Sequence, residues 1–157
     1  MSALLVLCVL IPIVTAALAF LWPGTRPVSA RISVAGMLAL LAAALLLLRE
    51  VMANGVLVAH MGGWDAPMGI TLVADPLGAL LVVVAAVVGL AVSIHAIDDI
   101  PDDVAANGFD SFLHLLIAGV VGAFLTGDIF NLYVWFEVML ISSFALMVPG
   151  GDRVRLD

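Results

Sequence analysis

The sequence predicts an all-α integral membrane protein, and its composition, its long apolar runs and its scarcity of charge carry that prediction. Of the 157 residues, 65% are hydrophobic, and the mean hydropathy is +1.30. A soluble domain is only about half apolar. Charged residues make up 11% of the chain, lysine is absent, and the formal net charge is −7. We therefore expect a lipid bilayer around this chain and no nucleic acid as a partner.

Five apolar runs are candidates for helices that cross a bilayer, which takes roughly 20 residues. The expected spans are 3–22, 32–52, 77–97, 112–126 and 129–148, in one membrane domain that covers 1–157. The fourth run is short and requires local thinning of the bilayer or a steep connection to the fifth run. Small residues recur along the runs, as at Gly119 and Gly122, and they predict close packing of helices in a bundle.

Between the second and third spans, residues 55–75 hold two short β-prone stretches. Gly62, Gly63, Pro67 and Gly69 separate them. This pattern predicts a β-hairpin. Because an isolated hairpin is at best marginally stable in water, we expect a small appendage of the membrane domain and not a domain of its own.

The arginines predict the orientation of the chain in the membrane. Arg26 and Arg31 fall between the first two spans and Arg153 and Arg155 follow the fifth, whereas only Arg49 lies at the opposite ends. Loops rich in Arg and Lys stay on the cytoplasmic side. We therefore expect a multi-pass protein of the cell membrane with its N-terminus outside, its C-terminus in the cytoplasm and the hairpin on the outer face.

Glu137 is the residue of this sequence that most needs an explanation. In a helix over 129–148 it lies roughly 12 Å from one end and about 16 Å from the other, near the midplane of a bilayer. A charged side chain at that depth costs about 2.5 to 3.5 kcal/mol on insertion scales. Two interpretations stand: a functional protonatable site, or a structural carboxyl that is hydrogen-bonded between helices. No lysine or arginine lies deep in any span, so a permanent counter-charge has to come from outside these residues.

Other polar residues near the ends of the spans have a structural and a functional interpretation. Asp128 precedes the fifth span and has the form of a helix N-cap, with cation entry as the alternative. Asp75, before Pro76, is a second predicted cap. His95 and His114 lie near the inner ends of the third and fourth spans, as packed or interfacial side chains or as proton relays. The sequence shows no pattern typical of metal ligands, a catalytic nucleophile or a cofactor, so we expect neither cofactor nor enzyme chemistry.

Two segments carry a resemblance to a known family. The stretch 114–146, with Thr126-Gly-Asp-Ile-Phe-Asn-Leu-Tyr-Val-Trp-Phe-Glu137 at its centre, resembles the D-type subunit (MrpD or MnhD type) of the Mrp multisubunit cation/proton antiporters. The hairpin stretch 62–75 resembles the same family, which is similar to the proton-pumping antiporter-like subunits of respiratory complex I. The resemblance covers nearly the whole chain and implies the fold of the N-terminal third of an antiporter-like subunit.

The resemblance implies a function as well as a fold. It makes Glu137 an ion-pathway carboxyl in a secondary transporter subunit, with other subunits, protons and monovalent cations such as Na⁺ as partners. The family's lysine that pairs with this glutamate, on a later helix, has no counterpart in this sequence. Two alternatives stay open. One is a structural membrane subunit that does not transport, and the other is a proton-pumping subunit of a complex I or membrane-hydrogenase type assembly.

Overall fold

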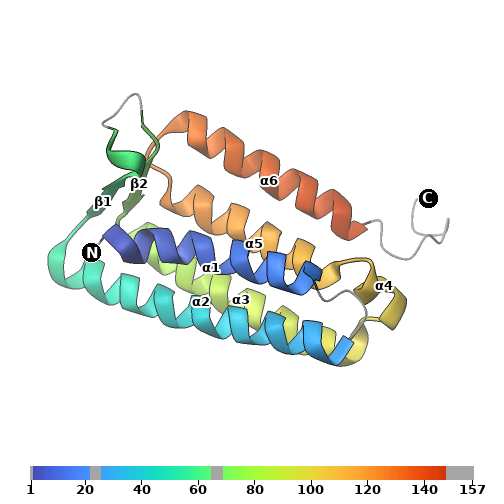
Figure 1. Cartoon of the computed structure of the whole chain (residues 1–157). Coiled ribbons are helices and arrows are strands. Elements are labelled where there is room, and N and C mark those ends of the chain that lie inside the picture. The colour runs from blue at the N-terminus through green and yellow to red at the C-terminus, as the bar shows by residue number, and fades with distance from the viewer. Residues whose placement is uncertain (1, 22–25, 65–68, 148–157) are drawn as a thin grey trace.

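The structure is a computed structural model that describes residues 2–21, 26–64 and 69–147. Long helices run side by side and form a bundle, with a small β-hairpin at one end and a short helix at the other (Figure 1). The helices, in chain order, are α1 (Ser2–Leu21), α2 (Arg26–Asn54), α3 (Pro76–Asp99), α4 (Asp102–Ala106), α5 (Phe109–Leu125) and α6 (Ile129–Met147). We refer to the two ends of the bundle as the hairpin end and the α4 end.

Helix lengths agree with the predicted spans, with two informative differences. Among the described residues, α1, α2, α3 and α6 are long and apolar enough to cross a membrane. Helix α5 has 17 residues, so at 1.5 Å per residue it is about 25 Å long, shorter than the hydrocarbon core of a bilayer. Helix α2 begins at Arg26, earlier than the predicted start at residue 32, and has 29 residues. It is therefore longer than the hydrocarbon core is thick, which leaves Arg31 and Arg49 near its two ends.

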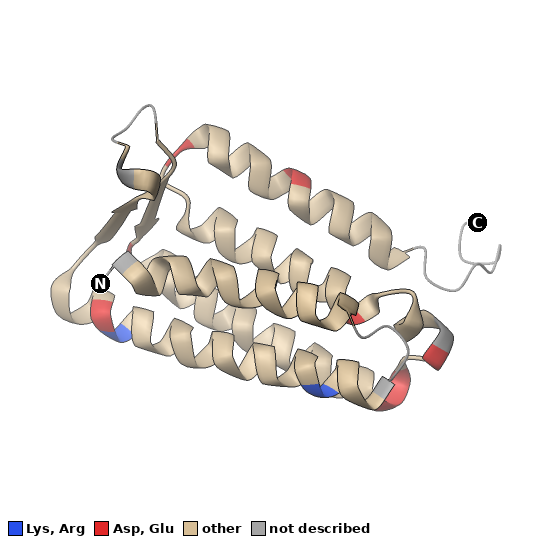
Figure 2. Ribbon diagram, viewed as in Figure 1, with Lys and Arg blue, Asp and Glu red and all other residues tan. Residues whose placement is uncertain are grey.

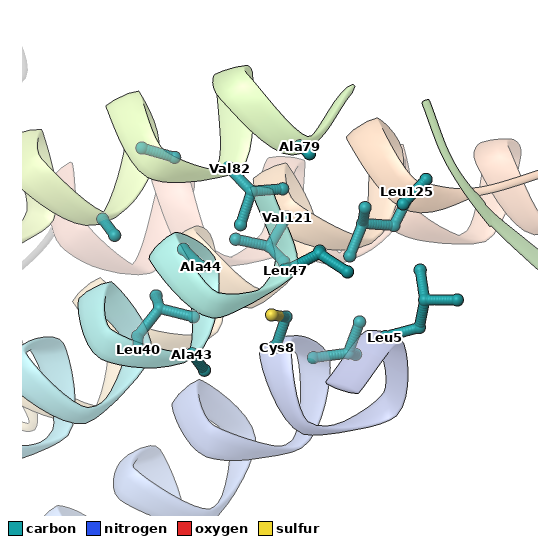
Figure 3. Packing of buried hydrophobic residues seen from close by; sticks show 14 of the residues in the cluster. Leu5, Cys8, Leu40, Ala43, Ala44, Leu47, Ala79, Val82, Val121 and Leu125 are labelled. Carbon is teal, nitrogen blue, oxygen red and sulfur yellow. The ribbon is translucent and has the colours of Figure 1, made fainter. Parts of the chain in front are cut away.

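Helix α5 occupies the centre of the bundle, because it packs against α1, α3 and α6. Apolar side chains of α1, α2, α3 and α5 meet in a common core, as Figure 3 shows for Leu5, Leu47, Val82 and Val121. Small residues bring the helices close together. A Cβ added at Gly89 on α3 would lie 2.9 Å from the sulfur of Met37 on α2. The prediction of close packing through small residues is therefore confirmed.

Helix α6 lies at the edge of the bundle and packs mainly on α5 (Figure 1). The contact depends on two glycines of α5. A Cβ added at Gly119 would lie 2.6 Å from Cγ of Met139, and one added at Gly122 would lie 2.2 Å from Cδ2 of Trp135. Only 11% of the residues in the apolar part of α6 are buried within the described chain. The helix thus presents a broad apolar face away from α5.

The predicted hairpin is present, and its strands are β1 (Leu57–His60) and β2 (Thr71–Ala74), with the 3₁₀ turn η1 (Met61–Gly63) after β1. The strands are antiparallel, with Leu57 opposite Ala74 and His60 opposite Thr71. The structure also shows what holds the hairpin in place, which the sequence did not. The backbone N–H of Gly127 donates to the carbonyl of Thr71 at 2.8 Å. The hairpin is thereby attached to the link between α5 and α6.

At the other end, the acidic connection between α3 and α5 folds into the five-residue helix α4, which the sequence analysis did not predict. Gly108 separates α4 from α5 with φ 93° and ψ 22°, a left-handed conformation that glycine adopts without strain. This turn lets α5 begin at Phe109, so that Asp110 belongs to its first turn. The turn at Gly108 therefore places Asp110 in the first turn of α5 and not in the connection that precedes it.

Candidate functional site

Glu137 lies partway along α6, away from both ends of the bundle. At 1.5 Å per residue it is about 12 Å from the start of this helix and about 15 Å from its end. Figure 2 shows most charged residues near the helix ends and a red segment within α6, whose only acidic residue is Glu137. The side chain is half-buried, and the hydroxyl of Tyr133, one turn earlier, donates a hydrogen bond to its carboxylate.

Large apolar side chains surround Glu137 on the outward side of α6. Phe130 is 73% exposed, Ile141 is 65% exposed and Phe144 is 62% exposed, at a spacing that places them on the same side of the helix as Glu137. We call this stripe of Phe130, Tyr133, Glu137, Ile141 and Phe144 the outer face of α6. A carboxyl within such a stripe is poorly solvated if lipid covers the face.

No cation accompanies this carboxyl in the part of the chain that the structure describes. Arg31 and Arg49 both belong to α2, which packs against α1 and α3, whereas α6 packs against α5. A basic partner from outside these helices stays a prediction. The site therefore consists of one carboxyl, that of Glu137, which can hold or release a proton, and of the Tyr133 hydroxyl that donates a hydrogen bond to it.

Asp128 is a helix cap, as predicted. Its Oδ1 accepts a hydrogen bond from the backbone N–H of Asn131 at 2.6 Å, and its Oδ2 accepts one from the N–H of Thr71 at 3.2 Å. Both carboxylate oxygens are therefore engaged, and the residue ties the start of α6 to strand β2. Asp75 caps α3 in the same way, since its Oδ1 accepts from the N–H of Gly78 at 2.6 Å.

The two candidate relay histidines lie in opposite environments. The side chain of His95 is 79% exposed, and its Nε2 is 3.8 Å from Oδ2 of Asp99, one turn further on. His114 is 0% exposed, in the interior of the bundle. The structure thus does not bring Glu137, His95, His114 and Asp128 together into a single site.

His114 instead belongs to a buried polar cluster that the sequence analysis missed. Ser29 on α2 donates from Oγ to Oδ2 of Asp110 at 2.5 Å. One turn along both helices, Nε2 of His114 lies 3.1 Å from the hydroxyl and 3.1 Å from the carbonyl oxygen of Ser33. The Ser33 hydroxyl in turn lies 3.2 Å from that of Ser93 on α3. We call these five residues the polar cluster.

A signal for the polar cluster was present in the sequence. Ser29 and Ser33 are four residues apart, as are Asp110 and His114, so each pair lies on one face of its helix. The fourth span was predicted to begin at residue 112, two residues after Asp110, whereas the structure places Asp110 in the first turn of α5 at 3% exposure. Helix α6 packs on a different face of α5, the one that carries Gly119 and Gly122. The polar cluster and Glu137 are therefore separate features.

Metal chemistry has no evident site here, since no group of three or more His, Cys, Asp or Glu side chains suited to a metal ion occurs among the described residues. The bundle with its attached hairpin is instead the fold of antiporter-like membrane subunits. It matches a chain of the membrane-bound sulfane sulfur reductase, an archaeal respiratory membrane complex, with a TM-score of 0.91 and 24% identity. That match covers 99% of this chain and 32% of the other, and it shows the fold alone. The chain is therefore a multi-pass membrane protein with this fold.

Sequence comparison is more specific. The chain is 38% identical over 156 residues to the D-type subunit of the Na⁺/H⁺ antiporter of Alkalihalophilus pseudofirmus, a match that covers 99% of this chain and 32% of the relative. It is 41% identical over 111 residues to the D-type subunit of the Na⁺/H⁺ antiporter of Bacillus subtilis, covering 71% of this chain and 22% of the relative. A chain of the Mrp complex from Dietzia sp. DQ12-45-1b matches with a TM-score of 0.85 and 30% identity, over 94% of this chain and 27% of that one.

The chain is thus a homologue of the D-type antiporter subunits, and the resemblance seen in the sequence is confirmed. No family model matches it. It spans about a third of the length of the first of these relatives, at 32%. The homologues point to a transporter and not to a catalytic enzyme.

Proposed function

We propose that this chain forms part of the D-type subunit in a Mrp-type antiporter that exchanges monovalent cations, Na⁺ among them, for protons. In this proposal Glu137 is a carboxyl of the ion or proton pathway. The observation that carries the proposal is the position of Glu137 partway along α6, on a face that the described helices leave uncovered. The names of the homologous proteins support the reaction, and the chemistry of the carboxyl supports the role of the residue.

The energetics favour a functional carboxyl at this depth. A charged side chain near the midplane of a bilayer costs about 2.5 to 3.5 kcal/mol on insertion scales, and such residues are mostly functional. The single hydrogen bond from Tyr133 offsets only part of that cost. A basic side chain that approaches Glu137 from another helix would favour its ionised form, and withdrawal of that side chain would favour the protonated form. Movement of the partner would thus couple a conformational change to uptake or release of a proton.

The proposal also specifies what covers α6. The chain spans about a third of the length of a homologous subunit. We therefore expect further helices, from the rest of such a subunit or from neighbouring subunits, to pack on the outer face of α6. They would supply the basic partner of Glu137. The arginine distribution supports insertion in the cell membrane with the N-terminus outside, the hairpin end outward and the α4 end cytoplasmic.

Glu137→Gln is the variant that tests the proposal, since it keeps the shape and hydrogen bonding of the side chain and removes its titration. In membrane vesicles that contain the complete assembly, we expect the variant to assemble normally and to lose cation/proton exchange. Glu137→Asp should keep part of the activity, because it retains the carboxyl with a shorter reach. Glu50→Gln is the matched control, since Glu50 lies near the end of α2, bonded to Asn54. It should exchange at the native rate.

Normal assembly of Glu137→Gln together with exchange at the native rate would refute the transport role. The chain would then be a structural membrane subunit. A second alternative is a proton-pumping subunit of a complex I or membrane-hydrogenase type assembly, and the fold shared with an archaeal respiratory complex is the observation that favours it. Copurification distinguishes the two assemblies, because redox-active partner subunits would support the respiratory alternative and antiporter subunits would support ours.

A further inference from the structure

A cavity at the α4 end of the bundle borders the polar cluster at Ser29. Its volume is about 320 Å³, and the ends of α1 and α2, helix α4 and the start of α5 enclose it. Since one water occupies roughly 30 Å³ of liquid, such a volume has room for several waters. Ser29, Asn107 and Ser111 contribute polar groups to the lining. The cavity is thus large enough and polar enough to be hydrated.

Ser29 connects this cavity with a buried acid. The same residue that lines the cavity donates from its hydroxyl to Oδ2 of Asp110 at 2.5 Å. Asp110 is 3% exposed, yet it lies in the first turn of α5, where the helix dipole favours a negative charge. Its carboxyl is therefore one hydrogen bond away from a residue of the cavity wall.

The hydrogen bonds of His114 fix where this imidazole can take up a proton. A carbonyl oxygen only accepts, so the contact of Nε2 with the Ser33 carbonyl, at 3.1 Å, places a hydrogen on Nε2. In the neutral ring the lone pair is then on Nδ1. This nitrogen is buried and has no hydrogen-bond partner among the described residues. Burial disfavours a charged imidazole, so a proton on this unpaired nitrogen needs a negative charge nearby.

A proton on His114 needs a negative charge nearby, and the polar cluster contains one acidic side chain, that of Asp110. Helices α2 and α3 contribute only the hydroxyls of Ser29, Ser33 and Ser93 to the polar cluster. Asp110 interacts electrostatically with His114 and is the only charged side chain in the cluster. At the α1 and α4 side, the described residues that line the cavity are apolar apart from Asn107. Uptake of a proton would thus neutralise a buried anion or form an imidazolium beside it.

We propose that Asp110 and His114 form a buried proton-binding site that is loaded from the α4 end through the water-accessible cavity. A proton from water in the cavity binds the Asp110 carboxylate or Nδ1 of His114, and it returns to water by the same route when it leaves. Only a proton moves in this step, so no bond between heavy atoms forms or breaks and no electron is transferred. The site lies on a face of α5 other than the one that packs against α6, the helix that carries Glu137. It does not depend on the transport role proposed for Glu137.

Protonation of the site can be measured directly by infrared difference spectroscopy between acidic and alkaline buffer, on the whole chain in lipid nanodiscs. We expect a carboxylic acid band that disappears in Asp110→Asn and persists in Glu137→Gln. We also expect an imidazole band that disappears in His114→Gln and persists in the controls His60→Gln and His95→Gln. Isotope labelling of the aspartate carboxyls in the unmutated chain should shift the carboxylic acid band, which separates an aspartate from Glu50 and Glu137.

Two results would overturn the proposal. The first is a spectrum in which neither Asp110 nor His114 changes protonation at any pH at which the chain stays folded. The second concerns access. Cys8, the single native cysteine, is first replaced by Ala so that only the introduced thiol can react. Ser111→Cys should then react with a small water-soluble thiol reagent several-fold faster than Ala118→Cys, because Ala118 is 0% exposed. Equal inertness of the two cysteines would mean that water does not enter the cavity.

Discussion

Gly122 is predicted to control the position of α6, and with it the position of Glu137. A Cβ at residue 122 would lie 2.2 Å from Cδ2 and 2.3 Å from Cε2 of Trp135. Carbon atoms in ordinary contact are about 3.5 to 4.0 Å apart, so Gly122→Ala has to push α6 outward by about 1 Å or more. The atoms that the Cβ would meet belong to the rigid ring system of the indole and not to the end of a flexible side chain, so a small adjustment of the side chain does not relieve the clash.

The magnitude follows from the cost of adding atoms to a packed interface, which is about 1 to 3 kcal/mol. We expect Gly122→Ala to lower the free energy of unfolding of the purified chain in lipid nanodiscs by that amount. If Glu137 acts as proposed, a shift of about 1 Å should also slow exchange by up to roughly 10²-fold in the complete assembly. Ala91→Val is the matched control, because it adds methyl groups at an exposed position on α3, where substitutions change stability by within about 0.5 kcal/mol.

A double variant tests the physical reason itself. Trp135→Phe removes one ring from the side chain that an alanine at residue 122 would meet. The two substitutions should therefore be strongly non-additive, with Gly122→Ala costing much less in the Trp135→Phe background. Native stability of Gly122→Ala, or strictly additive effects in the double variant, would show that the contact between α5 and α6 does not depend on this glycine.

Two further predictions concern the hairpin end and the topology. Asp128→Ala removes the cap of α6 and the bond to Thr71, so it should lower the free energy of unfolding by about 2 kcal/mol, whereas Asp98→Ala, at an exposed site on α3, should leave it unchanged. Equal effects of the two changes would contradict the anchoring role of Asp128. Cysteines introduced at Pro101 and at Ala66 should react with an impermeant thiol reagent from opposite sides of the membrane, and reaction from the same side would overturn the proposed orientation.

Much of this fold is encoded in local sequence patterns. Apolar runs predicted the long helices because spanning a bilayer needs a stretch of consecutive apolar residues. Gly62, Gly63 and Gly69 marked the turn region of the hairpin because turns need small and flexible residues. Asp75 and Asp128 were predictable caps because a cap bonds to N–H groups only two or three residues ahead. Glu137 stood out for the same local reason, as an acid within an apolar run.

Contacts between distant parts of the chain were decided only by the tertiary structure. The second bond of Asp128 joins residues 57 positions apart, and it shows why the hairpin is held in place. Asp110 meets Ser29 across 81 positions, so its burial could not be inferred from its own acidic neighbourhood. The same holds for the central place of α5, the shortest of the five long helices, and for the peripheral place of α6. A sequence pattern reports which residues share a face of a helix, whereas the packing of helices decides what that face meets.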